Sequence, residues 1–254
     1  MALTPDQIAK LPQNIVNMYT YLEEFIIQDI ARRISNSGQL TATTEQQLMI
    51  AKDLGIDIKE IEEKVADILK KSQKEVDKLF QEAAATSMAP ENELYKKARM
   101  ATFDINDSEL QAYITAASLQ TKKEFRNITG SLGFATKKNG KIVYSDIAKF
   151  YQETVDFANM QVVTGVTTRQ QAVKRAVRRM TNSGLRYVNY DSGYSMNVQD
   201  VINRTVRTSA NQMCNKLTMY MAEQNGVELF ETSAHAGQRP SHSEWAGQVF
   251  KWNK

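Results

Sequence analysis

The sequence predicts a mainly α fold, or an α+β fold if the few short strands of its C-terminal part pair. The chain has only four prolines and eleven glycines in 254 residues, which favours long helices over many short strands. Apolar residues recur every three or four positions, the spacing of one helix face. The β-prone pieces, 133–136, 141–144, 184–190 and 227–233, all come after residue 130.

The composition bounds the class of protein. Apolar residues make up 42% and charged residues 24%, as in a typical soluble globular domain. A single cysteine, Cys214, excludes an internal disulfide framework and fits a reducing compartment. The sequence has neither a secretory signal at its start nor an apolar run of membrane-spanning length. We therefore expect no membrane partner.

The N-terminal part predicts helices with marked ends. Thr4-Pro5 suits a helix start, and the apolar stripe from Ile15 to Ile34 predicts a helix over 12–34. We expect a second helix from Thr44 to Gly55 and a third from Asp57 to about Ala85. The segment 84–90 contains Pro90 and predicts a break. We place the boundary between a helical N-terminal region, 1–100, and a core domain, 101–254, within 86–105.

The C-terminal part predicts four more helices and a hairpin. The helices are expected over 108–129, 145–162, 168–180 and 198–225. Thr168 and Asn197 are the expected N-caps of the last two, and Gly226 the stop of the last. The four residues 137–140 join two β-prone pieces, 133–136 and 141–144, and Asn139-Gly140 within them is the strongest local hairpin signal in the sequence.

Charge is distributed unevenly along the chain. Residues 1–100 carry 13 basic and 16 acidic side chains, and residues 101–254 carry 19 basic and 13 acidic ones. The excess of positive charge in the second part suggests an anionic partner there.

Within this part, the helix over 168–180 concentrates four basic residues: Lys174, Arg175, Arg178 and Arg179. Their spacing places like charges at i,i+4 twice, which is unfavourable unless an anion or a carboxylate neutralises them. One interpretation is contact with phosphates of double-stranded DNA or with an acidic partner. The other is a solubilising face paired with the acidic N-terminal helices. The sequence alone leaves both open.

Both histidines of the chain, His235 and His242, lie in one short segment near the end. With Glu231 and Glu244 nearby they are candidate metal ligands, but zinc sites usually need three or four ligands at closer motif spacing. We therefore favour a structural loop and expect no cofactor. In it Pro240 fixes a turn, Gly247 permits a tight backbone, Arg239 ties loop oxygens, and Trp245 covers a small core.

Three stretches carry a resemblance to a known family. They run from Tyr187 to Gly193, from Val206 to Gln212, and from Ser233 to Phe250. Their distinctive residues are Asn189 and Asp191 in the first, Arg207 and Asn211 in the second, and His235, Arg239, Pro240, His242, Trp245 and Gly247 in the third. In this order they resemble the phage minor capsid protein 2 family, head-morphogenesis proteins of tailed phages of Gram-positive bacteria, related to the Mu F-like group.

The resemblance implies a non-enzymatic structural protein of the virion, made in the host bacterial cytoplasm. It implies portal protein and other capsid components as partners, with a place at the portal vertex or in the capsid interior and several copies around the portal. It assigns no catalytic residue. Relatives often continue beyond this motif, so we expect this chain to be a trimmed product or the ordered part of a longer one. The alternative is a metal-dependent hydrolase or nuclease that uses His235 and His242.

Overall fold

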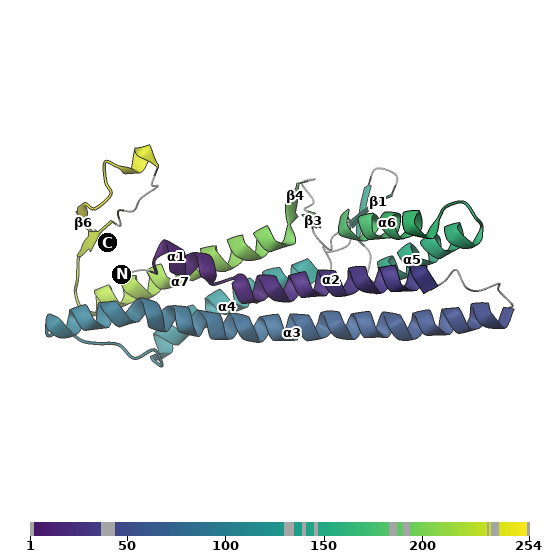
Figure 1. The fold of residues 1–254 in the computed structure, drawn as a ribbon. Coiled ribbons are helices and arrows are strands. Elements are labelled where there is room, and N and C mark those ends of the chain that lie inside the picture. Colours follow the sequence, from purple (N-terminus) through teal and green to yellow (C-terminus); the bar gives the residue numbers. More distant parts are fainter. Residues whose placement is uncertain are drawn as a thin grey trace.

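The computed structural model describes residues 3–36, 44–129, 135–138, 141–144, 147–182, 187–189, 194–232, 234 and 239–252. They form an elongated helical bundle (Figure 1). The mainly α prediction is confirmed. The elements are α1 Pro5–Lys10, α2 Gln13–Asn36, α3 Thr44–Lys97, α4 Ser108–Thr129, β1 Ala135–Lys138, β2 Lys141–Tyr144, α5 Ile147–Val163, α6 Arg169–Met180, β3 Tyr187–Asn189, β4 Ser195–Asn197, α7 Val198–Gln224, β5 Leu229–Glu231, the 3-10 turn Pro240–His242, and β6 Val249–Lys251.

Several predicted helix ends are confirmed by their capping bonds. The Thr4 hydroxyl accepts from the backbone of Gln7, whose side chain in turn accepts from the Thr4 backbone. Thr168 and Asn197 accept from backbone N–H groups at the starts of α6 and α7. Side-chain oxygens of this kind satisfy N–H groups that have no partner inside the helix.

The prediction of two helices between residues 44 and 85 is wrong, because α3 is continuous over 54 residues and about 80 Å long. A single interior glycine costs only about 1 kcal/mol, so Gly55 does not end the helix. Pro90 costs about 3 kcal/mol in a helix interior. Continuing the helix beyond residue 85 buries Met88 before the proline and Tyr95 after it, and each large apolar side chain contributes about 1.5–3 kcal/mol.

One hydrophobic core, the α4–α7 core, joins α4 and α7 to the start of α2 and the C-terminal half of α3. Its edge-to-face pair of Tyr19 and Phe125, with ring centroids 6.1 Å apart, links α2 to α4. Its large buried members include Ile15, Tyr19, Phe80, Tyr95, Leu110, Ile114, Phe125, Ile202, Met213, Leu217 and Met221.

A second core, the α5–α6 core, joins α5 and α6 to the second half of α2 and to α3. It contains Leu22, Ile26, Ile30, Ile34, Ile68, Phe150, Tyr151, Val155, Ala158, Ala172, Ala176 and Met180. Helices α2 and α3 therefore pass through both cores. Each core contains residues from both sides of residue 100, while the proposed division into 1–100 and 101–254 stays a prediction.

The strands form three separate two-stranded antiparallel sheets. Lys138 pairs with Lys141, which confirms the predicted hairpin, but its first strand is Ala135–Lys138 rather than 133–136. Strands β3 and β4 lead into α7, and Val188 of β3 is buried in the α4–α7 core. Strands β5 and β6 form a hairpin beyond the other end of α7, away from the bundle (Figure 1).

Candidate functional site

The described part of the histidine motif belongs to the β5–β6 hairpin. The sheet register pairs Phe230 with Phe250. Beyond β5, the Thr232 backbone donates to Gln248 and accepts from Gly247, both at 2.9 Å. The Thr232 hydroxyl also donates to the carbonyl of Trp245. These bonds join the two arms of the hairpin beyond the paired strands.

The tip of this hairpin is a compact turn. The imidazole of His242 lies against the indole of Trp245, with ring centroids 4.6 Å apart. Pro240 begins the 3-10 turn as predicted. Gly247 has φ +70°, a left-handed conformation that favours glycine. The tip is thus held by local stacking and backbone bonds.

The expectation that Trp245 covers a small core is corrected. Its side chain is 44% exposed, and neither described core includes a residue beyond Val227. Arg239 is exposed, and its carbonyl accepts from the backbone N–H of His242 at 2.8 Å, but its side chain does not cap the 3-10 turn. Trp245 instead contacts His242 within the hairpin. The spacing of aromatic residues in the sequence does not distinguish such a local contact from burial in a core.

The metal alternative is not tested by the structure, because His235 lies outside the described residues. Among the described ones, no group of three or more His, Cys, Asp or Glu residues is placed to hold a metal ion. Cys214 is buried in α7. Burial raises the pKa of its thiol, against a smaller opposite effect of a hydrogen bond with Ser87. Cys214 therefore belongs to the helical core rather than to the histidine motif.

Of the other two motifs, the first is at β3, whose partner β4 leads into α7, and the second is on α7. Asn189 is at the end of β3, opposite Ser195 of β4, and Asp191 lies outside the described residues. On α7 itself, Arg207 donates from its guanidinium to the carbonyl of Ala9 at 3.1 Å, and Asn211 is exposed. The motifs are therefore spread over the length of α7, about 40 Å, and do not form one site.

The contact of Arg207 has a clear physical role. Ala9 lies in the last turn of α1, where carbonyls have no partner inside the helix. A cation there also interacts favourably with the helix dipole. Arg207 thereby fastens α1 onto α7. Sequence analysis found the motif but not this role, since the two residues are 198 positions apart.

The basic helix α6 presents the second candidate site. Its sequence RQQAVKRAVRRM contains five basic residues and no acidic one. Ala172, Ala176 and Met180 are buried against α2 and α5, while Lys174, Arg175, Arg178 and Arg179 are exposed. The helix thus shows a basic face to solvent.

Carboxylates neutralise little of this face. Arg179 lies 3.8 Å from Glu153 and stacks over Phe150, 5.1 Å from the ring centroid. Lys174, Arg175 and Arg178 have no ion pair with any described side chain. Among the residues that the structure describes, three cations on one helix face therefore lack a counter-charge.

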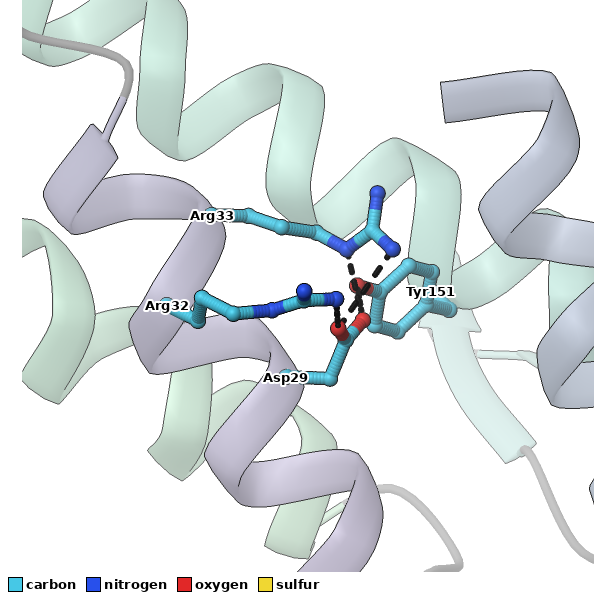
Figure 2. A network of polar contacts seen from close by, with 4 residues as sticks. All are labelled: Asp29, Arg32, Arg33 and Tyr151. Carbon is cyan, nitrogen blue, oxygen red and sulfur yellow. Dashed lines mark hydrogen bonds and ion pairs between the residues drawn. The ribbon is translucent and has the colours of Figure 1, made fainter. Parts of the chain in front are cut away.

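A polar network links α2 to α5, the two helices on which α6 packs (Figure 2). Asp29 of α2 accepts from Arg32 and from Nε of Arg33, both at 2.5 Å, and from the hydroxyl of Tyr151 on α5. The side chains of Asp29 and Arg33 are only 7% and 9% exposed. The guanidinium of Arg33 also stacks on the ring of Tyr151, 5.6 Å from its centroid.

Opposing effects act on Asp29. Burial raises its pKa, but hydrogen bonds from Arg33, Tyr151 and Arg32, with the charge of Arg33, outweigh burial and lower the pKa below its usual value. Asp29 therefore stays ionised and fixes α2 against α5. Sequence analysis missed this network. Asp29 lies between Ile26 and Ile30 of the apolar stripe. Because a carboxylate is seldom buried without a partner, its position on this face was the available signal of a polar network.

Comparison with known proteins decides the family. The family model of phage minor capsid protein 2 matches residues 3–253. The chain belongs to the phage minor capsid protein 2 family. A search of curated proteins and one of solved structures gave no match.

Membership confirms the resemblance to the family, and the match extends beyond the three motifs to residues 3–253. It supports a structural role in a bacteriophage capsid and implies a place in the virion. In the described part of the minor capsid protein, none of the helices has the length and apolarity that crossing a bilayer requires.

Proposed function

We propose that this minor capsid protein lies at the portal vertex, contacts portal and capsid components, and places α6 against the packaged double-stranded DNA. The observation that carries the DNA contact is the basic face of α6, with three cations that lack a described counter-charge. Like charges at i,i+4 destabilise a helix. Phosphates would relieve that repulsion.

The surroundings of α6 also suit a DNA contact. The helix is packed on α2 and α5, which the Asp29 network holds together. A rigid helix can align several cations with successive phosphates at low entropic cost. The face offers no exposed aromatic residue for stacking on bases, so the expected recognition is of backbone charge and independent of DNA sequence.

The test is the salt dependence of binding to a random-sequence DNA duplex. The double variant Arg175→Ala/Arg178→Ala removes two contacts, so the slope of log K against log salt should fall in magnitude by about 1.8. The matched control is Lys96→Ala/Lys97→Ala, two exposed lysines in the last turn of α3. The DNA proposal fails if the α6 variant keeps the wild-type slope, or if the control lowers it equally.

The position at the portal vertex rests on the three motifs, which resemble proteins that associate with the portal. The uneven charge of the chain fits a role between two partners, with protein on one side and nucleic acid on the other. An asymmetric reconstruction of the particle should show this chain around the portal in several copies. Density spread evenly over the capsid shell would contradict the portal proposal.

We further propose that the protein is not an enzyme and needs no metal. Elemental analysis of purified protein should find no stoichiometric zinc or manganese. If such a metal were present and lost, together with a hydrolytic activity, in His235→Ala/His242→Ala, the hydrolase alternative would replace this proposal.

A further inference from the structure

The β5–β6 hairpin is a sheet of only two strands, and it exposes several large apolar side chains. Val249 is 62% and Phe250 48% exposed, and Leu229, Trp245 and Trp252 are also exposed. A two-stranded hairpin is marginally stable alone in water. An exposed apolar cluster commonly marks an interaction surface.

The register of the hairpin identifies which backbone groups point outward. Thr232 donates to Gln248 at 2.9 Å, and Trp252 donates to Glu228 at 2.8 Å. Both pairs lie two positions from the central pair Phe230–Phe250. Hydrogen-bonded pairs alternate with non-bonded ones in antiparallel sheets. Phe230–Phe250 is therefore a hydrogen-bonded pair, and the two pairs that flank it are not. The N–H and C=O groups of Val249 and Lys251 therefore point away from β5.

The hairpin has two outer edges, one on β5 and one on β6, and the edge of β6 is better suited to pairing with a further strand. All three β6 side chains are exposed, whereas Phe230 of β5 is partly covered by the ring of Trp252, with centroids 6.2 Å apart. No described residue bonds to the outward groups of Val249 and Lys251. An open, apolar strand edge of this kind is a template for pairing with another strand.

We propose that two copies of this chain pair through β6, antiparallel and about a two-fold axis at Phe250, and form a four-stranded sheet. This register places Val249 of each copy opposite Lys251 of the other, so the two lysines do not face each other. It joins all outward groups of both strands in hydrogen bonds. It also brings the two Phe250 rings together and makes one aromatic face with Phe230 and Trp252.

The self-complementary register favours a second copy over another protein. A two-fold interface needs the same patch on both partners, and this patch meets that condition without opposing like charges. The interface is small, so pairing is weak at low concentration. A high local concentration of copies would strengthen it. The inference does not depend on the DNA contact of α6.

A disulfide trap tests the register. In the proposed pair the two copies of residue 250 form a non-hydrogen-bonded pair, with Cα atoms about 4.5 Å apart, within reach of a disulfide. The variant Phe250→Cys should therefore form a covalent dimer under mild oxidation. Cys214 is 1% exposed and should not compete.

Val249→Cys is the matched control, because this residue is adjacent and more exposed. The proposed register separates its two copies by about 8 Å, beyond disulfide reach. We expect at least tenfold faster dimer formation for Phe250→Cys on non-reducing gels. Equal rates for the two variants, or no dimer of Phe250→Cys with a thiol that reacts freely, would overturn the proposal. So would attachment of Phe250→Cys to a different protein in purified particles.

A second pair of variants separates edge pairing from misfolding. In the Phe250→Cys background, Val249→Pro removes an outward N–H and should abolish the dimer, since proline blocks an edge. Leu229→Pro removes the equivalent N–H on the β5 edge and should leave the dimer intact. Neither N–H belongs to the β5–β6 ladder. Tryptophan fluorescence reports the hairpin directly, because both tryptophans, Trp245 and Trp252, lie in it.

Discussion

Replacing Asp29 by asparagine should destabilise the bundle strongly, because it removes the negative charge that neutralises buried Arg33. Two unit charges about 4 Å apart interact by about 4 kcal/mol at an effective dielectric constant of about 20. Removing one partner of a buried pair typically costs about 3–5 kcal/mol. Arg32 is 62% exposed and adds little. We expect Asp29→Asn to lower the free energy of unfolding by about 3 kcal/mol.

Urea denaturation followed by far-ultraviolet circular dichroism measures this loss. The midpoint should fall by about 1 M or more, since unfolding slopes are about 1–3 kcal/mol per molar urea. Asp67→Asn is the control, because Asp67 forms a solvent-exposed i,i+4 pair with Lys71 at 2.8 Å. That change should leave the midpoint nearly unaltered.

Two further measurements sharpen the reasoning about Asp29. Its pKa is lowered in the folded state, so its stabilisation is present above the unfolded pKa of about 3.9 and is lost as pH falls through the folded pKa. The difference between wild type and Asp29→Asn should therefore shrink below about pH 4. The triple variant Asp29→Leu/Arg33→Met/Tyr151→Phe should recover most of the stability, since it removes both buried charges and the hydroxyl together. A loss below about 1 kcal/mol in Asp29→Asn, or an equal loss in the control, would refute the argument.

Two other predictions concern helix ends. Arg207→Ala removes the contact with the end of α1, so amide hydrogen exchange in residues 5–10 should accelerate about fivefold, corresponding to about 1 kcal/mol. The exposed Lys216→Ala on α7 should not change it, and an unaltered rate in Arg207→Ala would contradict the assigned role. Arg99, which follows α3, has φ +59°, so Arg99→Gly should raise the free energy of unfolding by about 1 kcal/mol. Gly226→Ala should lower it by a similar amount, because Gly226 has φ +66°, and the reasoning fails if both variants shift the urea midpoint the same way.

Local signals in the sequence predicted most of the helix ends correctly. The turn after α7 shows why. The N–H of Val227 bonds to the carbonyl of Ala222 at 2.9 Å, and that of Gly226 to Glu223 at 3.1 Å, the pattern that ends helices at a left-handed residue. Only neighbours within six positions take part, so the residue types alone indicate the stop.

The end of α3 is the opposite case. Arg99 there adopts the conformation usual for glycine, and Met100 and Arg99 donate to Tyr95 and Lys96 at 2.8 and 3.1 Å. No residue type marks this stop, and the expected break came earlier, at Pro90. Past Pro90 the helix buries Tyr95 in the α4–α7 core, which offsets part of the cost of the proline. A local reading of the sequence does not include that energy.

The sequence by itself determined the mainly α class, the caps of α6 and α7, the basic face of α6 and the family, which the ordered motifs carry. These features depend on residue types at short spacing. Only the tertiary structure decided that Asp29, Arg33 and Tyr151 meet, that Arg207 fastens α1, and that the described part of the histidine motif stands apart as a hairpin. The contact of Tyr151 with Asp29 spans 122 positions and that of Arg207 with Ala9 spans 198. They follow from the packing of α2, α3 and α7 through shared cores, which no local pattern specifies.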